Sequence, residues 1–311
     1  MSKVLITGAA GYIGSILTPE LLKKGHEVVA IDNFFYDQMS LLDVCNDKNL
    51  KIIRGDARNR ELISEHIKGA EFIIPLACIV GAPACDRDPL AAKSVNLDAI
   101  KMILELREEN QKIIYPNTNS GYGVGQQGVH CDENTPLKPI SLYGRLKVEA
   151  EKALLEAGGS ITLRLATVFG VSPRMRLDLL VNDFVYRAVT DRFAVLFEPH
   201  FKRNYIHVRD VAAAFIHAME NFDNMKNQSY NVGLSDANMS KMELCQEIKK
   251  QLPDFHFFEA KIGEDPDKRD YIVSNEKIEK TGFKPKISLQ EGIEELIKGY
   301  QIIRRNHFSN L

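Results

Sequence analysis

The feature that most constrains the fold of this chain is a glycine-rich segment directly after a short apolar run at the amino terminus. Residues 3–7 have the character of a buried strand, and Gly8, Gly11 and Gly14 then lead into a helix-like segment at 12–24. Glycines in such a turn let the backbone approach a phosphate, and the free amides of the helix N-terminus favour an anion. The segment therefore predicts a phosphate-binding turn at the start of a parallel α/β sheet.

Short apolar runs alternate with helix-like segments through the first half of the chain. This rhythm is typical of repeated βαβ units around a buried parallel sheet. The expected strands span 3–7, 27–32, 50–54, 72–76, 112–118 and 161–167, and the expected helices span 12–24, 60–67, 93–109 and 143–156. Pro19 falls inside the first helix, where it removes one hydrogen bond. We therefore predict an α/β fold with a Rossmann-type, doubly wound parallel sheet.

The rhythm loosens after Thr167, which indicates a change of organisation. We expect residues 1–167 to form a nucleotide-binding domain that carries the catalytic residues. Residues 168–311 are expected to form mainly a smaller α/β lobe for the substrate, with some segments returning to the first domain. Two late helices are expected to begin with capping boxes, one at Ser240 and one at Ser288.

The balance of charge excludes several classes of partner. The chain has 311 residues and a formal net charge of -2, with no long run of one sign, so neither nucleic acid nor an anionic membrane is expected. Its N-terminal segment lacks the apolar length of a signal peptide or a membrane span, and we expect a cytoplasmic protein. The five cysteines and eight histidines form no metal-ligand pattern, so no metal is expected.

Acidic residues at two strand ends indicate the cofactor. Asp32 ends the second expected strand, where a carboxylate accepts hydrogen bonds from the ribose of a bound dinucleotide. The same carboxylate would repel the additional phosphate of NADP, and no arginine immediately follows it. Asp56 follows the third strand, where it is placed to bind the adenine amino group, and residues 76–78 follow the fourth. These strand ends together predict NAD.

Tyr143 and Lys147 lie four residues apart in an expected helix, so both side chains point to one side. A free phenol has a pKa of about 10, and its deprotonation at neutral pH costs roughly 4 kcal/mol. A nearby ammonium and the positive charge of an oxidised nicotinamide would lower that cost. Tyr143 is therefore a candidate base with Lys147 as its electrostatic support. Thr118 ends the fifth strand, where its hydroxyl is expected to bridge the substrate and Tyr143.

Together these residues resemble the extended short-chain dehydrogenase/reductase family, the NAD-dependent epimerases and dehydratases. The resemblance rests on Thr7-Gly8-x-x-Gly11-x-x-Gly14, Asp32, Gly55-Asp56, Leu76-Ala77, Asn96, Thr118 ahead of Tyr122-Gly123, Tyr143-x-x-x-Lys147 and the segment 203–210. It implies an oxidoreductase. The residues it implies for the NAD site are Gly8, Ala10, Gly11, Tyr12, Ile13, Gly14, Asp32, Asn33, Asp56, Ala57, Leu76, Ala77, Cys78, Asn96, Tyr143 and Lys147.

The resemblance also implies a nucleotide sugar as substrate. Arg203 and Arg269 would hold its diphosphate through charge-assisted contacts. Asn182 resembles a diphosphate ligand of the UDP-galactose 4-epimerase branch. The full set of expected substrate residues is Thr118, Ser120, Thr167, Arg174, Arg176, Asn182, Arg203 and Arg269.

The residues after Thr118 narrow the reaction. Asn119-Ser120 stands where the 4,6-dehydratase branch has an Asp-Glu pair, and the cysteine of the 3,5-epimerising branch is missing, so both activities are disfavoured. Oxidation at one carbon, C4, remains, followed by re-reduction in a 4-epimerase or by release of the ketone in a 4-dehydrogenase. The stretches 116–123, 166–178 and 263–271 resemble GDP-heptose C4 dehydrogenases of bacterial capsule biosynthesis. That resemblance implies GDP-D-glycero-α-D-manno-heptose as the substrate.

Two alternatives stay open at this point. One is a UDP-glucose 4-epimerase-like enzyme, and the other is an NAD-binding regulator without catalysis, although such regulators commonly lack the Tyr/Lys pair that this chain has. The family resemblance also implies a homodimer in which the helix of Tyr143 and Lys147 contributes to the interface. Val148, Ala150 and Ala153 on that helix are apolar, but they could equally face the sheet.

Overall fold

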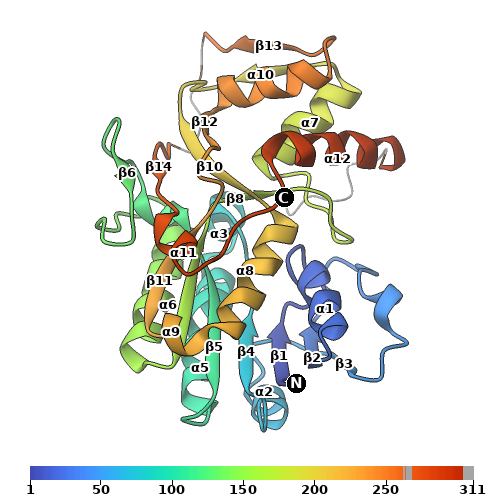
Figure 1. Cartoon of the computed structure of the whole chain (residues 1–311), viewed down its shortest axis with the longest axis vertical. Coiled ribbons are helices and arrows are strands. Elements are labelled where there is room, and N and C mark those ends of the chain that lie inside the picture. Colours follow the sequence, from blue (N-terminus) through green and yellow to red (C-terminus); the bar gives the residue numbers. More distant parts are fainter. Residues whose placement is uncertain (262, 264–267, 304–311) are drawn as a thin grey trace.

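The computed structural model describes residues 1–261, 263 and 268–303. At its centre lies a seven-stranded sheet, which is parallel throughout (Figure 1). The strand order is β11 (Gln228–Val232), β7 (Ser160–Leu165), β5 (Lys112–Thr118), β4 (Phe72–Pro75), β1 (Lys3–Thr7), β2 (Glu27–Asp32) and β3 (Leu50–Arg54). The chain winds outward from β1 in both directions, so the predicted doubly wound sheet is confirmed.

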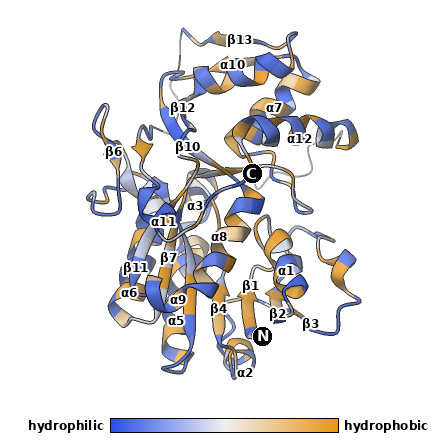
Figure 2. Ribbon diagram, in the orientation of Figure 1, coloured by the Kyte–Doolittle hydropathy of each residue, from blue (hydrophilic) through white to orange (hydrophobic). Residues whose placement is uncertain are grey.

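Each face of the sheet carries its own apolar core, because successive side chains of a strand point to opposite faces. In β1, Val4 and Ile6 belong to one core, whereas Leu5 belongs to the other. The first core is closed by α1 (Gly14–Lys23), α8 (Val208–Glu220) and α9 (Phe222–Met225). The second is closed by α2 (Arg60–His66), α5 (Ala99–Leu106) and α6 (Leu142–Ala157), with α3 (Ala82–Arg87) and α4 (Pro89–Lys93) beside them. Burial on both faces explains the apolar runs of the central strands β1, β2 and β4, which are mostly orange in Figure 2.

Several expected elements have different limits in the structure. β1, β2, β3 and β5 have the expected bounds and β4 is one residue shorter, but the strand expected at 161–167 is divided at Ala166. Its first part is β7 of the central sheet, and its second part is β8 (Thr167–Phe169) of another sheet. The helix expected at 93–109 begins earlier, as α4, and continues through a π-helical turn, η2 (Ser94–Asp98), into α5. Pro19 lies inside an otherwise continuous α1.

The second half of the chain forms most of a second lobe, at the top of Figure 1. Its sheets are β12-β10-β8 and β13-β9, built from β9 (Phe193–Leu196), β10 (Lys202–His207), β12 (Asn238–Ser240) and β13 (His256–Glu259). Its helices are α7 (Leu180–Thr190), α10 (Lys241–Gln251) and α12 (Leu289–Ile302), packed around an apolar core of their own. The capping boxes predicted at Ser240 and Ser288 are both present.

Several short elements complete the structure. β14 (Ile272–Val273) pairs with β6 (His130–Cys131), and α11 (Glu276–Glu279), η1 (Leu42–Val44) and η3 (Asn119–Tyr122) are single turns. From the second half of the chain, α8, α9 and β11 pack with the first half. The division into two domains at residue 167 stays a prediction. α8, α9 and β11 are segments of the second half that pack in the first domain. Within the described ranges no helix is long and apolar enough to cross a membrane, and no three potential ligands gather for a metal.

Candidate active site

The glycine turn is packed too tightly for side chains. A Cβ added to Gly8, whose φ is +71°, would lie 2.6 Å from the Ala77 nitrogen, and one added to Gly14 would lie 2.5 Å from the Ala9 carbonyl oxygen. The turn therefore rests directly on the segment 76–78 after β4, at the carboxyl edge of the sheet. This close-packed backbone at the start of α1 fits the phosphates of a dinucleotide.

Asp32 lies at the end of β2 and joins this turn to the loop that follows it. Its Oδ2 accepts a hydrogen bond of 2.9 Å from the Ala10 nitrogen, and its Oδ1 accepts bonds from the Phe34 nitrogen (2.8 Å) and Gln38 Nε2 (3.2 Å). Burial raises the pKa of Asp32, and these hydrogen bonds oppose the rise. The carboxylate is thus held at the strand end where a ribose is expected, whereas Asn33 beside it is exposed.

Tyr12 fastens the glycine turn to the second lobe. Its hydroxyl donates a hydrogen bond of 2.6 Å to the Gly170 carbonyl oxygen and accepts one of 3.2 Å from Asn182 Nδ2, and its own carbonyl accepts one of 2.8 Å from Ser172 Oγ. Asn182 is fully buried, and its Oδ1 also accepts from the Gly170 nitrogen at 2.9 Å. The oxygen and the nitrogen of this amide are therefore both hydrogen-bonded within the protein. A contact of Asn182 with the diphosphate stays a prediction, and it would require one of these hydrogen bonds to break.

Asn96 and Asp56 also have protein partners. The Asn96 amide lies in η2 and bonds Ile79 twice, accepting from its nitrogen at 2.8 Å and donating to its oxygen at 2.9 Å. It thereby holds the segment that contains Leu76, Ala77 and Cys78. Asp56 forms an ion pair of 2.6 Å with Arg58, and the hydrogen bonds from Arg58 lower the pKa of Asp56. Asn96 and Asp56 thus lie beside the ends of β4 and β3, and their role in binding the cofactor stays a prediction.

The start of α6 positions the candidate catalytic pair. Ser141 caps the helix by accepting a hydrogen bond of 3.1 Å from the Gly144 nitrogen, which places Tyr143 in the first turn and Lys147 one turn later. Lys147 is buried, and its Nζ lies 3.8 Å from the centre of the Tyr115 ring. Burial lowers the pKa of Lys147 to about 8. No local pattern in the sequence singles out Tyr115, whose ring contacts the Lys147 ammonium through a cation–π interaction.

The electrostatic surroundings of Tyr143 differ from those expected. Burial raises the pKa of the Tyr143 phenol, and the positive charges that oppose this rise are Arg176 and Arg269. Within the described part of the chain, no hydrogen bond joins Tyr143 to Thr118 or to Lys147. The positive charges that act on the phenol therefore come from two arginines of the second half of the chain, and the expected support by Lys147 stays a prediction.

A chain of hydrogen bonds leads from β5 to Arg269. Thr118 Oγ1 donates to Ser120 Oγ at 2.9 Å, and Ser120 Oγ in turn accepts a hydrogen bond from the Arg269 guanidinium. Ser120 lies in η3, which packs against the first turn of α6, since a Cβ on Gly144 would lie 3.4 Å from the Ser120 carbonyl oxygen. Thr118, Ser120 and Arg269 are thus brought together beside Tyr143. Residues 264–267, which belong to the stretch 263–271 named in the sequence analysis, lie outside the described residues.

The other expected substrate residues are spread around the join between the lobes. Arg176 is buried and paired with Asp178, with Nε and Oδ1 3.2 Å apart. Arg203 is buried in β10, where it donates to the Lys202 carbonyl oxygen at 2.8 Å, and Thr167 is half-buried at the start of β8. Arg174 lies on the cofactor side, against the loop after β2, with its guanidinium carbon 4.3 Å from the centre of the Tyr36 ring.

A buried ion pair joins α6 to the strands of the central sheet. Glu151 and Arg164 are both buried, with Oε1 and Nη2 2.7 Å apart, and Glu151 also accepts from Asn117 Nδ2 (2.6 Å) and Thr162 Oγ1 (2.8 Å). These contacts tie α6 to β5 and β7. Sequence periodicity did not single out the pair, because a glutamate within a helix usually lies on the solvent-exposed face.

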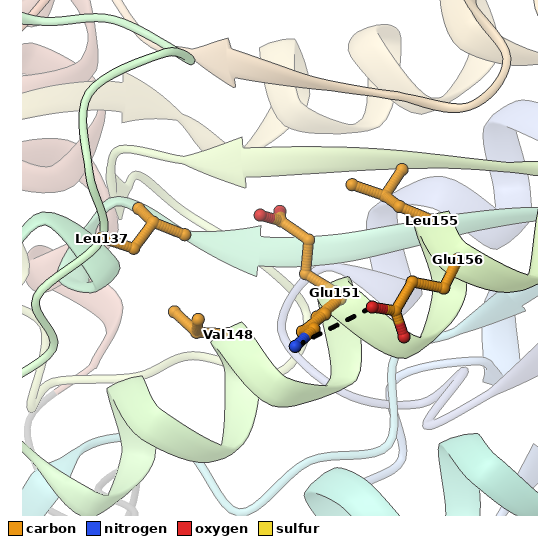
Figure 3. Close-up of a pocket in the computed structure, with 6 residues that line it drawn as sticks. Leu137, Val148, Glu151, Leu155 and Glu156 are labelled. Carbon is orange, nitrogen blue, oxygen red and sulfur yellow. Dashed lines mark ion pairs between the residues drawn. The ribbon is translucent and has the colours of Figure 1, made fainter.

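An open hollow of about 520 Å³ lies along α6 next to this pair (Figure 3). It is lined by Leu137, Val148, Glu151, Lys152, Leu155 and Glu156. The dashed line in Figure 3 is the ion pair of 3.8 Å between Lys152 and Glu156. None of the predicted catalytic or binding residues lines this hollow.

A doubly wound sheet with a close-packed glycine turn, an acidic residue at the end of β2 and a Tyr/Lys pair on α6 defines a dinucleotide-dependent oxidoreductase of the short-chain type. Residues 4–233 match the model of the NAD dependent epimerase/dehydratase family, and the chain belongs to this family. The predictions of the fold, of an NAD-dependent enzyme and of NAD as its cofactor are thereby confirmed.

Individual relatives cover almost the whole chain. An uncharacterized UDP-glucose epimerase of Bacillus subtilis, YtcB, is 30% identical, over 94% of this chain and 95% of its own. Among solved structures, the UDP-N-acetylglucosamine 4-epimerase of Methanobrevibacter ruminantium is 25% identical with a TM-score of 0.84, over 97% of this chain and 98% of its own. The dTDP-glucose 4,6-dehydratase of Bacillus anthracis, in complex with NAD, is 20% identical with a TM-score of 0.84, over 99% of both chains, and shares the fold.

Proposed function

We propose that this enzyme uses NAD to oxidise the C4 hydroxyl of a nucleotide-activated sugar, with Tyr143 as the base. The observation that carries the proposal is the partly buried Tyr143 side chain on the helix of Lys147, with the positive charges of Arg176 and Arg269 acting on its phenol. Burial alone opposes phenolate formation, so a base at this position requires positive charge close by. The surroundings of Tyr143 supply it.

The chain's own groups divide the work as follows. The glycine turn and Asp32 hold NAD, which supplies the acceptor for the hydride when bound. Tyr143 takes the proton of the C4 hydroxyl, while Lys147 and the two arginines stabilise the phenolate. Thr118 and Ser120 orient the hydroxyl through their own linked hydroxyls. Proximity and orientation then contribute much of the rate.

We propose that Arg203 and Arg269 bind the nucleotide diphosphate. Arg176 and Asn182 are proposed to contact the substrate where the two lobes meet. Guanidinium groups suit this task because they bind phosphate oxygens in pairs. Arg269 is placed to act on both parts of the substrate, since it reaches Ser120 at the sugar end.

Two outcomes follow from oxidation at C4. The names of the relatives support a 4-epimerase for a UDP-sugar, in which the ketone is reduced again from the other face. The stretches 116–123, 166–178 and 263–271 support a C4 dehydrogenase for GDP-heptose, which releases the ketone in bacterial surface polysaccharide synthesis. The relatives named above favour the epimerase.

One experiment tests both. The purified enzyme is incubated with NAD and a panel of UDP-, GDP- and dTDP-sugars, including UDP-glucose, UDP-N-acetylglucosamine and GDP-heptose, and the products are identified by mass spectrometry and NMR. An epimer keeps the substrate mass, whereas a ketone is two hydrogens lighter. If no sugar nucleotide in the panel is converted, the proposed function is wrong.

We also propose a homodimer that uses α6, in a cytoplasmic enzyme. Ala150 is fully buried in the core, whereas Val148 lines the open hollow on the helix, so part of the apolar surface of α6 is accessible to a partner. Light scattering is expected to give twice the chain mass. A monomer mass would contradict the dimer, and cell fractionation tests the location.

A further inference from the structure

Arg174 connects the substrate lobe with the cofactor loop. It lies between β8 and α7, yet its side chain is buried against Tyr36, in the loop after β2. Its guanidinium carbon lies 4.3 Å from the centre of the Tyr36 ring, which is a cation–π contact. The sequence predicts a contact of Arg174 with the substrate, and that role stays a prediction. In the structure its side chain contacts the loop that follows Asp32, the residue expected at the ribose.

Hydrogen bonds link the Tyr36 loop to Asp32. The Tyr36 nitrogen donates to Gln38 Oε1 at 3.1 Å, and Gln38 Nε2 donates to Asp32 Oδ1 at 3.2 Å. The loop that carries Tyr36 is therefore hydrogen-bonded to the Asp32 carboxylate through Gln38, and the Arg174 guanidinium lies over a ring of this same loop. Burial raises the pKa of Asp32, and the charge of Arg174 adds a smaller opposing effect to that of the hydrogen bonds which the carboxylate accepts.

We infer that Arg174 sets how strongly this enzyme discriminates between NAD and NADP. A carboxylate at the ribose repels the 2′-phosphate of NADP, and an arginine at the same place attracts it. No arginine follows Asp32 directly in the sequence, but the fold brings one there from the second lobe. Arg174 offsets the repulsion by Asp32 and offers the phosphate a charge-assisted contact, so the preference for NAD is weaker than Asp32 alone would impose.

This inference rests on the proposed position of Asp32 at the ribose. It differs from a purely structural role for Arg174, in which the stack only fastens the second lobe to the first. A structural role would change the binding of NAD and NADP by equal factors. A role at the 2′-phosphate changes the ratio of the two.

The test measures the dissociation constants of NAD and NADP for the full chain by calorimetry, without any sugar. Arg174→Gln is expected to weaken NADP binding at least about tenfold and NAD binding less than about threefold, as loss of a charge-assisted contact to phosphate predicts. Arg174→Lys keeps the charge without the planar stack and is expected to fall between. The matched control is Arg60→Gln, which removes an exposed arginine paired with Glu105 and should leave both constants unchanged.

Two further variants keep the test decisive. If Arg174→Gln does not fold, Tyr36→Leu removes the stacking surface and is expected to shift the ratio in the same direction. Asp32→Asn is expected to improve NADP binding relative to NAD. If Asp32→Asn changes the ratio and the Arg174 and Tyr36 variants do not, the inference is wrong and the ribose position of Asp32 stands. If Asp32→Asn has no effect on the ratio, both are wrong, while the proposed sugar chemistry is tested separately.

Discussion

The hydroxyl of Tyr12 donates a hydrogen bond of 2.6 Å to the carbonyl oxygen of Gly170, so a residue of the glycine turn holds the entry to the second lobe. Asn182 Nδ2 donates to the same hydroxyl at 3.2 Å. The turn that is expected to hold the cofactor phosphates is therefore hydrogen-bonded directly to the loop that leads to Arg174 and Arg176.

Tyr12→Phe should destabilise the protein by about 1–3 kcal/mol, because it leaves buried polar partners without their hydrogen bond. Urea unfolding of both proteins measures this. Tyr205→Phe is the matched control, since the buried Tyr205 hydroxyl has no partner among the described residues. Its removal should leave the free energy of unfolding the same or slightly higher. Equal losses in the two variants would show that the Tyr12 bonds contribute little.

Tyr143→Phe should reduce turnover at least about a hundredfold, which is the usual contribution of a general base. Binding of NAD should change little, because the glycine turn and Asp32 are untouched. Steady-state kinetics with the converted sugar nucleotide, together with calorimetry of NAD binding, separate the two effects. Unchanged turnover would remove Tyr143 from the mechanism.

Lys147→Met should stabilise the cofactor-free protein near neutral pH while it abolishes turnover. Burial lowers the pKa of Lys147 to about 8, so below pH 8 the folded state carries a buried charge at a cost of roughly 3 kcal/mol. The unfolded chain binds the proton more tightly, so the stability of the wild type rises with pH between about 8 and the usual lysine value. The advantage of the variant should shrink over that interval. A difference that is constant with pH would contradict this account.

Glu151→Ala should destabilise the fold by roughly 3–5 kcal/mol, because it leaves the Arg164 guanidinium buried without its carboxylate. Glu149→Ala on the same helix removes an exposed partner of Lys101, and its cost should stay below about 1 kcal/mol. Thermal unfolding of the two variants compares the sites directly. Similar melting temperatures would mean that the Glu151 contacts contribute less than their burial suggests.

Local patterns accounted for the first half of the fold and for the residues at its strand ends. Four strands have the predicted bounds. Three of them, β1, β2 and β5, are apolar runs buried on both faces, which can be recognised from the chain alone, whereas β3 lies at the edge and is largely exposed. The strand expected at 161–167 failed at its end because Ala166 bonds to Val232 on β11, and Thr167 then pairs with Tyr205 in another sheet. These partners lie far along the chain, so no periodicity within the segment could reveal the change of sheet.

By itself the sequence determined the glycine turn after β1, the acidic residue at the end of β2 and the spacing of Tyr143 and Lys147. Each of these depends on neighbours within one turn or one strand, where backbone geometry follows directly from residue order. Only the tertiary structure decided that Arg269 reaches Ser120 and that Arg174 stacks on Tyr36 near Asp32. A charge acts through space, and the folding of two lobes against each other sets which charges become neighbours.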